Sequence, residues 1–283
     1  MQARVGETYL KRLFVFYIPL FMFLVLILFP FYWMTIASIK PDQELYTVRM
    51  SPFIVRNPTP SHWLFLFGET LFARWSINTF LIATASTLIS LTCGVLAGYS
   101  LARLRFAGST AIGVSIFVTY LVPPTLLFIP LSRVIATLGL MDNPLALILS
   151  YPTILVPFCT WLMMGYFKTI PKELEECARI DGATRFQAFY RIILPLATPG
   201  ILSAGIFAFT LSWNEFLFAL VFLSTPEYKT LSVGVVSELI RGDTFYWGPL
   251  MAGALFGSIP VAIVYSFFVE YYVAGLTGGA VKG

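Results

Sequence analysis

The chain has 283 residues and a formal net charge of +4; 58% of its residues are hydrophobic and only 11% are charged. Soluble domains carry about 25% charged residues, so this composition, with a mean hydropathy of +0.83, excludes a soluble globular protein. One histidine (His62) and three cysteines without motif spacing (Cys93, Cys159, Cys177) exclude a disulfide framework and a histidine-based metal or catalytic cluster. The sequence predicts an integral membrane protein.

Six stretches of the chain are long and apolar enough for helices that cross the hydrocarbon core, which takes about 20 residues. They are 13–36, 77–102, 109–132, 144–166, 199–223 and 249–272. The first is too long and too rich in phenylalanine for a signal peptide, and it ends in Tyr32 and Trp33, which are typical of the membrane interface. We therefore expect an all-α, polytopic fold in which residues 1–283 form a single transmembrane domain.

Basic residues predict the orientation of these spans. With the N-terminus in the cytoplasm, inside segments hold eleven of the eighteen Lys and Arg residues and a net charge of +6, whereas outside segments are neutral. This asymmetry favours two cytoplasmic termini, although the outside loop 37–76 carries four basic residues. Four prolines predict that this loop is an irregular lid. Arg133 and Asp142 border a short outside turn and are expected to be solvated.

The inside segment 167–198 is the most charged part of the chain and predicts two short helices. Pro171 suits a helix start, Gly182 a helix end, and Pro195 the end of the second helix. Thr184 and Gln187 have the spacing of a capping box. The first helix would carry Leu174, Cys177 and Ala178 on one face, and the second carries Phe186, Phe189, Ile192 and Ile193. This apolar surface either docks on a partner or packs on the chain's own spans; DNA binding is disfavoured because the segment is nearly neutral and both ends enter membrane.

A family resemblance rests on this segment. The pattern Glu176-Cys177-Ala178-x3-Gly182-x9-Ile192-x-Leu194-Pro195 resembles the cytoplasmic signature of ABC importer permeases, E-A-A-x3-G-x9-I-x-L-P, and departs from it only at Cys177. Trp213-Asn214-Glu215-Phe216 and the ending 275–283 look like the carbohydrate-uptake class, in particular the smaller permease of maltose-type transporters. The resemblance covers about 77–283.

The resemblance implies a type I permease fold with six transmembrane helices in a bacterial inner membrane. It implies a second homologous permease, two ATPase subunits that bind ATP and Mg, an extracytoplasmic solute-binding protein, and no nucleic acid. It also implies an ATPase-coupling surface and an ATPase-contacting tail within 274–283. The coupling residues would be Glu176, Cys177, Ala178, Asp181, Gly182, Ala183, Ile192, Leu194 and Pro195; the tail residues would be Gly275, Gly278, Gly279 and Lys282. The alternative for the tail is a frayed chain end.

Other residues within the spans suggest a path for a sugar. Asn214 and Glu215 fall in the fifth predicted span, where a carboxylate costs roughly 2.5–3.5 kcal/mol and normally faces a polar interior. We expect them to line a translocation path with Tyr120 and Trp213; the alternative is a hydrogen bond that fixes helix packing. Glycine pairs at 94/98 and 253/257 permit close helix approach. Prolines at 123–124, 130 and 260 should kink the third and sixth spans.

Two further functions compete with an importer permease. The chain has no G-x-x-x-x-G-K-[ST] motif, so an ATP-driven importer would need a separate ATPase, and this chain would not be an enzyme. An ion-coupled secondary transporter usually has several ionisable groups within the membrane and inverted repeats, and a membrane enzyme needs a catalytic cluster that this sequence lacks.

In the outside loop 224–248, Tyr228, Tyr246 and Trp247 suit contact with a binding protein or sugar, or act as interfacial anchors.

Overall fold

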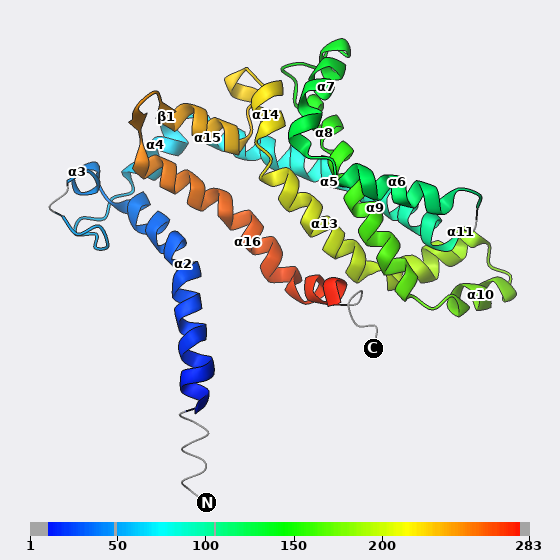
Figure 1. Cartoon of the computed structure of the whole chain (residues 1–283). Coiled ribbons are helices and arrows are strands. Elements are labelled where there is room, and N and C mark those ends of the chain that lie inside the picture. The colour runs from blue at the N-terminus through cyan, green and yellow to red at the C-terminus, as the bar shows by residue number, and fades with distance from the viewer. Residues whose placement is uncertain (1–10, 48–49, 105, 278–283) are drawn as a thin grey trace, which may run out of the picture. The chain divides into compact units, whose positions relative to one another are not determined.

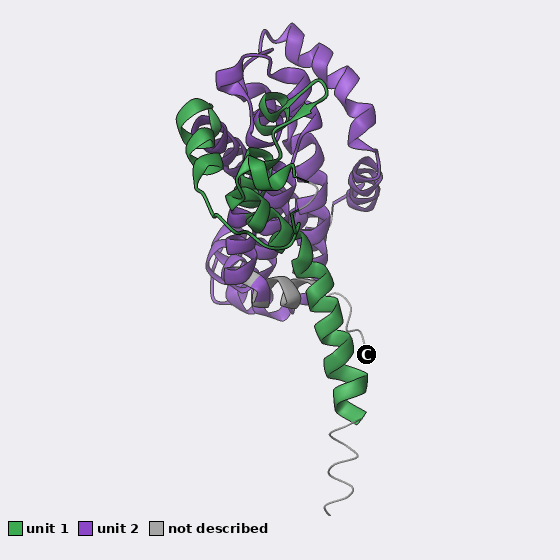
Figure 2. Ribbon diagram, turned by 90° about the vertical axis from the view of Figure 1, so that its left-hand side faces the viewer, with its two compact units in different colours: residues 1–72, 235–258 green, residues 73–234, 259–283 purple. Residues whose placement is uncertain are grey.

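The structure is a computed structural model that describes residues 11–47, 50–104 and 106–277. Most of these residues are helical, which confirms the predicted helical class, and the strands of the described chain form one two-stranded antiparallel pair. The chain divides into two compact units (Figure 2). Unit 1 comprises residues 1–72 and 235–258, and unit 2 comprises residues 73–234 and 259–283.

Unit 1 contains the first long helix and the small hairpin (Figure 1). Its elements are the π-helix η1 (Leu13–Tyr17), α2 (Ile18–Ile39), α3 (Asp42–Leu45), α4 (Ser61–Glu69), β1 (Ile240–Arg241), β2 (Thr244–Phe245) and the first part of α16 (Trp247–Thr277). Ile240 pairs with Phe245 and Arg241 with Thr244. The hairpin turns at Gly242, whose φ of 60° is the left-handed conformation that glycine accepts without strain. Helix α2 is apolar and exposed along most of its length, as expected for a helix that faces lipid or another subunit.

The predicted lid 37–76 is more ordered than its prolines suggested. The Glu44 carboxylate is buried and accepts the backbone N–H groups of Arg56 and Asn57, each at 3.0 Å. The Arg56 N–H contributes most to lowering the pKa of Glu44, and burial opposes the shift. The buried Lys40 ammonium donates to the Ser51 carbonyl at 2.7 Å. A buried carboxylate and a buried ammonium therefore hold the loop through its own backbone.

Unit 2 contains most of the helices. Its elements are α5 (Phe72–Arg103), α6 (Ser109–Tyr120), α7 (Pro124–Thr137), α8 (Pro144–Ser150), α9 (Pro152–Thr169), α10 (Glu173–Ile180), α11 (Arg185–Ala188), the π-helix η2 (Phe189–Ile193), α12 (Leu194–Leu196), α13 (Thr198–Trp213), α14 (Leu217–Phe222), the 3-10 helix η3 (Pro226–Tyr228), the end of α16, and the start of α15 (Leu231–Leu239), whose residues from 235 onward belong to unit 1. Helix α9 packs against α6 and α13 (Figure 1). A Cβ on Gly94 would lie 2.4 Å from the Cys159 Cβ, and one on Gly98 would lie 2.8 Å from the Met163 Cβ. The close approach predicted at this glycine pair is confirmed, and it joins α5 to α9.

The helices differ from six continuous spans. Four helical stretches are long and apolar enough to cross a membrane, and there are up to six among the described residues if each bent helix pair counts as one span. The four are Leu13–Ile39, Phe72–Arg103, Pro144–Thr169 and Trp247–Phe267. The predicted span 109–132 is instead α6 and α7, which meet at 98°. Pro123 and Pro124 explain the break, because proline lacks the N–H of a helical hydrogen bond and restricts the residue before it. The continuous helix predicted over 199–223 is wrong, since α13 ends at Trp213 and α14 begins at Leu217.

Candidate functional site

The turn between α10 and α11 is built by two complementary caps. Gly182 has a φ of 88°, and the Ala183 N–H donates to the Ala178 carbonyl at 2.9 Å, which closes α10 in the left-handed manner that favours glycine. Thr184 and Gln187 form the predicted capping box: the Gln187 N–H donates to the Thr184 hydroxyl at 3.2 Å, and the Thr184 N–H donates to the Gln187 amide oxygen at 2.8 Å. Because both caps are satisfied, the angle between the two helices is well specified.

One face of this helix pair is fixed to the ends of the long helices. The Tyr99 hydroxyl of α5 donates to the Glu175 carboxylate at 2.7 Å, and the Tyr99 ring lies 4.5 Å from the Phe189 ring, centroid to centroid. Arg103 donates to the Ile170 carbonyl just before α10. Ala178, Ala188, Phe189 and Ile193 are buried. This face matches the expectation that the pair packs on the chain's own spans.

The pair also carries large apolar side chains that are exposed. Ile180 is 84% exposed, Phe186 73% and Tyr190 62%, and the Phe186 and Tyr190 rings stack with their centroids 6.4 Å apart. Leu174 and Cys177 are also exposed, whereas Ala178 is buried, so only part of the predicted apolar face of α10 packs on the chain's own spans. We call Ile180, Phe186 and Tyr190 the exposed apolar face.

The signature residues divide between these two faces. Glu176 and Asp181 are exposed, and the Glu176 carboxylate has no partner within the described chain. Ala178 is buried, and Ile192 and Leu194 are partly buried. Ala183 follows Gly182 in the turn, and Pro195 is an exposed residue in α12. The signature thus combines residues that hold the turn with residues that remain accessible to a partner.

Glu215 lies in the break between α13 and α14 and not within a helix, which corrects the prediction. Its carboxylate accepts the backbone N–H groups of Phe218 at 2.8 Å and Ala219 at 3.1 Å, and the Tyr151 hydroxyl at 2.9 Å. The first two are the N–H groups at the start of α14, which have no partner inside a helix and favour a negative charge. Glu215 is therefore the N-terminal cap of α14, whatever further part it has in transport.

The other predicted path residues lie at the ends of two helices: Tyr120 at the end of α6, and Trp213 and Asn214 at the end of α13. Tyr120 is the last residue of α6, and its ring centroid lies 5.7 Å from that of Phe158 on α9. Trp213 is buried and stacks on Phe209 one turn earlier, with the ring centroids 5.7 Å apart. Asn214 is exposed and donates through its amide to the Thr210 carbonyl at 2.9 Å. The structure thus describes these three residues in separate local contacts.

Asp142 is a structural residue that the sequence interpretation missed. It is not simply solvated: its carboxylate accepts the N–H groups of Ser224 and Thr225, each at 2.8 Å, and its own N–H donates to the Phe222 carbonyl at 2.8 Å. The Thr225 hydroxyl hydrogen bond is the main cause that lowers the pKa of Asp142. Asp142 thus secures the end of α14 while Glu215 secures its start, so the short helix is held at both ends.

The predicted outside loop 224–248 is anchored to α5 at its start. The Trp75 indole donates to the Pro226 carbonyl at 2.7 Å, and the Leu231 N–H donates to the Thr79 hydroxyl at 2.7 Å. Tyr228, Tyr246 and Trp247 all have exposed side chains. At the other end of the chain, α16 extends through Gly275, which is therefore helical. The predicted tail contacts at Gly278, Gly279 and Lys282 lie outside the described residues.

A known family matches most of the chain, including the capped helix pair and the signature residues. Residues 90–278 match the family described as binding-protein-dependent transport system inner membrane component. The chain belongs to this family. A member of the binding-protein-dependent family is a multi-pass permease subunit of the bacterial inner membrane, and its transport is driven by an ATPase that is a separate protein. The family assignment therefore favours an importer permease over an ion-coupled transporter or an enzyme.

Individual relatives match nearly the whole chain. The inner membrane ABC transporter permease protein YcjP of Escherichia coli K12 is 35% identical, with 95% of this chain and 96% of that protein covered. The sulfoquinovosyl glycerol transport system permease protein SmoH of Agrobacterium fabrum is 37% identical, and the match covers 90% of this chain and 89% of that protein. The trehalose/maltose transport system permease protein MalG of Thermococcus litoralis is 32% identical, covering 98% and 99%.

A solved structure shares the fold. The crystal structure of a bacterial ABC transporter involved in the import of the acidic polysaccharide alginate contains a chain that superimposes with a TM-score of 0.79. The match covers 93% of this chain and 97% of that chain at 24% sequence identity. This similarity shows that the fold of that chain extends over almost all of the present chain.

Proposed function

We propose that this chain is one of two homologous permease subunits that together form the path of an ATP-driven importer for a sugar or related polyol. The chain would cross the membrane six times with both termini in the cytoplasm. Two ATPase subunits would bind ATP and Mg, and an extracytoplasmic solute-binding protein would deliver the sugar. The names of SmoH and MalG, which are similar over nearly their whole length, support a carbohydrate substrate.

The two-faced helix pair α10–α11 is the observation that carries this proposal. A rigid contact with an ATPase requires an element that is fixed to the spans and presents a free surface. Tyr99 and Arg103 supply the attachment through Glu175 and Ile170. The exposed apolar face supplies the free surface, since large apolar side chains gathered beside charged residues are typical of a protein interaction site. Coupling would run through Glu176, Gly182 and their neighbours.

The proposed translocation path combines side chains from more than one helix. Tyr120, Trp213 and Asn214 offer aromatic rings and an amide, which suit the apolar faces and hydroxyls of a sugar. Glu215 would act there as the residue that fixes α14 beside the path. The glycine-containing end of the chain, 274–283, would contact the ATPase subunits. Loss of a path residue should reduce transport and leave ATPase binding intact, whereas loss of the chain end should also alter ATPase activity.

Cys177 allows the topology and the ATPase contact to be tested together, because it is exposed on α10 beside Glu176. The double variant Cys93→Ser, Cys159→Ser leaves Cys177 as the one thiol. A membrane-impermeant maleimide should label it in inside-out vesicles and not in right-side-out vesicles, and bound ATPase subunits should protect it. Labelling from the outside would overturn the orientation, and full labelling in the presence of bound ATPase would overturn the contact. Cys177→Ser, added to this double variant, provides the unlabelled control.

A further inference from the structure

Unit 1 contains a cavity that the permease function described above does not use. Its volume is about 660 Å³, within the range of about 300–1,000 Å³ that is usual for small-molecule sites. Its walls come from α3 and the residue that follows it, from the first half of α4, and from the segment that runs from the hairpin turn to the start of α16. All of the lining residues belong to unit 1.

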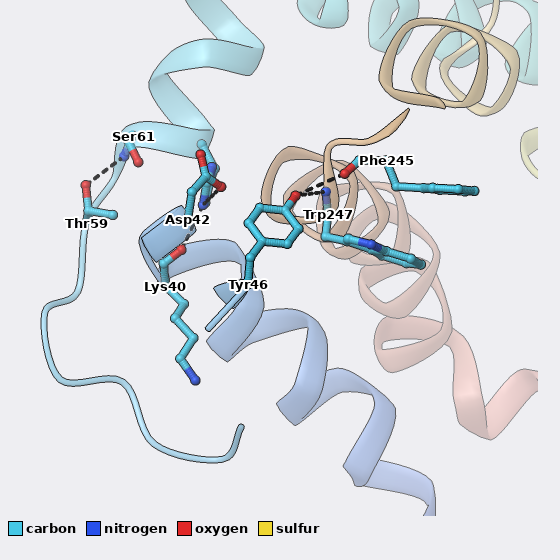
Figure 3. Close-up of polar contacts among 8 residues, drawn as sticks. Lys40, Asp42, Tyr46, Thr59, Ser61, Phe245 and Trp247 are labelled. Atoms are coloured by element: carbon cyan, nitrogen blue, oxygen red, sulfur yellow. Dashed lines mark hydrogen bonds and ion pairs between the residues drawn. The ribbon is translucent and has the colours of Figure 1, made fainter. Parts of the chain in front are cut away.

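The walls of the cavity are held by specific contacts. The Tyr46 hydroxyl donates to the Phe245 carbonyl at 3.0 Å and accepts the Trp247 N–H at 3.3 Å, so α3 is joined to the hairpin (Figure 3). The His62 ring is buried, and its Nε2 lies 2.8 Å from the Lys40 carbonyl oxygen. A Cβ at Gly248 would lie only 2.2 Å from that nitrogen, so the His62 ring fits there because Gly248 has no side chain.

The lining combines flat aromatic rings with carboxylates. Tyr46 is 53% exposed and Trp247 is 43% exposed, and the Trp247 ring stacks on Phe245 with the centroids 5.3 Å apart. Asp42 and Asp243 line the same cavity. The Asp42 carboxylate is largely exposed and lies 3.9 Å from the His62 Nε2.

This composition suits one class of ligand. Aromatic rings stack on the apolar C–H faces of a sugar ring, and carboxylates accept hydrogen bonds from its hydroxyl groups, which are stronger than bonds between neutral groups. No Lys or Arg is among the described residues that line the cavity, whereas two aspartates are. An anionic sugar would therefore meet like charge from these two carboxylates, and a neutral sugar would not.

We propose that this cavity is a binding subsite for a neutral sugar on the extracytoplasmic side of the permease. The inference rests on the proposed function, which places the loops 37–76 and 224–248 outside and makes a carbohydrate the substrate. Asp42 and Asp243 bind the hydroxyl groups, and Tyr46 and Trp247 provide the aromatic platform. The subsite shares no residue with the proposed path, which comprises residues 120 and 213–215.

The test measures sugar binding to the assembled transporter in lipid nanodiscs without the solute-binding protein. Glucose, maltose and trehalose serve as neutral probes, and glucuronate serves as the anionic probe. At least one neutral probe should change the tryptophan emission saturably, the change should be absent in Trp247→Phe, and glucuronate should bind at least tenfold more weakly. Asp42→Asn and Asp243→Asn should each weaken binding by about tenfold, the size expected for a hydrogen bond to a charged group. Glu69→Gln removes an exposed carboxylate of unit 1 that does not line the cavity, and it should bind like the wild type.

Three results would overturn the subsite. Either no neutral probe changes the tryptophan emission, or both aspartate variants bind sugar like the wild type, or brominated lipid quenches the Trp247 emission while sugar leaves it unchanged. The last result would identify Trp247 as a membrane-interface anchor. Asp243 is exposed in the hairpin, so its variant guards against a folding defect at Asp42. ATP-dependent uptake of the same sugars, measured with the binding protein present, separates the two proposals. Normal uptake without direct sugar binding would refute the subsite alone. If sugar binds directly, the two aspartate variants weaken that binding, and no uptake occurs, the subsite is supported and the proposed function is refuted.

Discussion

Replacing Gly182 with valine should uncouple the permease from its ATPase. Gly182 has a φ of 88°, and no atom lies within 4 Å of the position that a Cβ would occupy. The cost of a side chain is therefore set by the backbone alone, and for an L-residue in the left-handed conformation it is about 1–2 kcal/mol. A β-branched residue is disfavoured there more strongly than most. This cost would raise the fraction of opened α10–α11 turns by about 5–30-fold.

Gly139 provides a matched control. It ends α7 in the same way, with a φ of 69°, open space at the Cβ position, and a Leu140 N–H that donates to the Ile135 carbonyl at 3.0 Å, as Ala183 does to Ala178. Gly139→Val therefore imposes the same backbone strain at a turn on the opposite side of the membrane in the proposed topology. Gly182→Asn is a second control, because asparagine tolerates the left-handed conformation better than valine.

The assay measures the ATPase subunits retained on purification and the ATP hydrolysed per sugar transported. We expect Gly182→Val to insert in the membrane, to expose α10 amides to faster hydrogen exchange, and to lose ATPase or coupling. Gly139→Val should keep both, and Gly182→Asn should be intermediate. The reasoning fails if Gly182→Val retains ATPase and coupling at the wild-type level, or if Gly139→Val loses them to the same degree.

Three further predictions concern structure and stability. Glu215→Ala should destabilise the chain by about 0.5–2 kcal/mol, as loss of a helix cap does, and Glu215→Gln should destabilise it by less. Thermal unfolding in detergent measures both, and equal stability of both variants and the wild type would refute the capping role of Glu215. Because the pKa of Asp142 is lowered in the folded state, its carboxylate stabilises the fold above its unfolded pKa and loses this effect as the pH falls through the folded pKa. Asp142→Asn should therefore be less stable than the wild type at neutral pH and should lose less stability in acid. An unchanged dependence of stability on pH would contradict this. Gly98→Ala should impair folding because its Cβ would lie 2.8 Å from that of Met163, whereas Gly165→Ala, which meets nothing within 4 Å, should be tolerated; similar yields of both would contradict the close α5–α9 contact.

Features that depend on neighbouring residues could be predicted from the sequence. The turn at Gly182 and the capping box at Thr184 and Gln187 are local, because each needs only residues a few positions apart. The close approach at Gly94 and Gly98 could also be predicted, since small residues one turn apart leave a flat helix surface. Pro123 and Pro124 predicted a kink, although nothing local specified a bend of 98°.

The features that were missed depend on distant partners. The break at 214–216 contains neither proline nor glycine, and it exists because the Glu215 carboxylate caps α14 and accepts from Tyr151, 64 residues away. Asp142 contacts Ser224 across 82 positions. The lid 37–76 looked irregular because two of the three donors to the Glu44 carboxylate are backbone N–H groups, which carry no side-chain signature; the third is the Asn57 amide. An acidic residue shortly before a short apolar helix is the one signal that could have indicated the cap at Glu215.

The central claim, that this chain is a permease subunit of an ATP-driven sugar importer, is tested most directly by uptake into proteoliposomes. The complex containing this chain would be reconstituted with ATP inside and the sugar-loaded binding protein outside. We expect labelled sugar to accumulate with ATP, to stop accumulating with a non-hydrolysable analogue, and to be unaffected by ionophores. Accumulation that requires an ion gradient and proceeds without ATP would contradict the account.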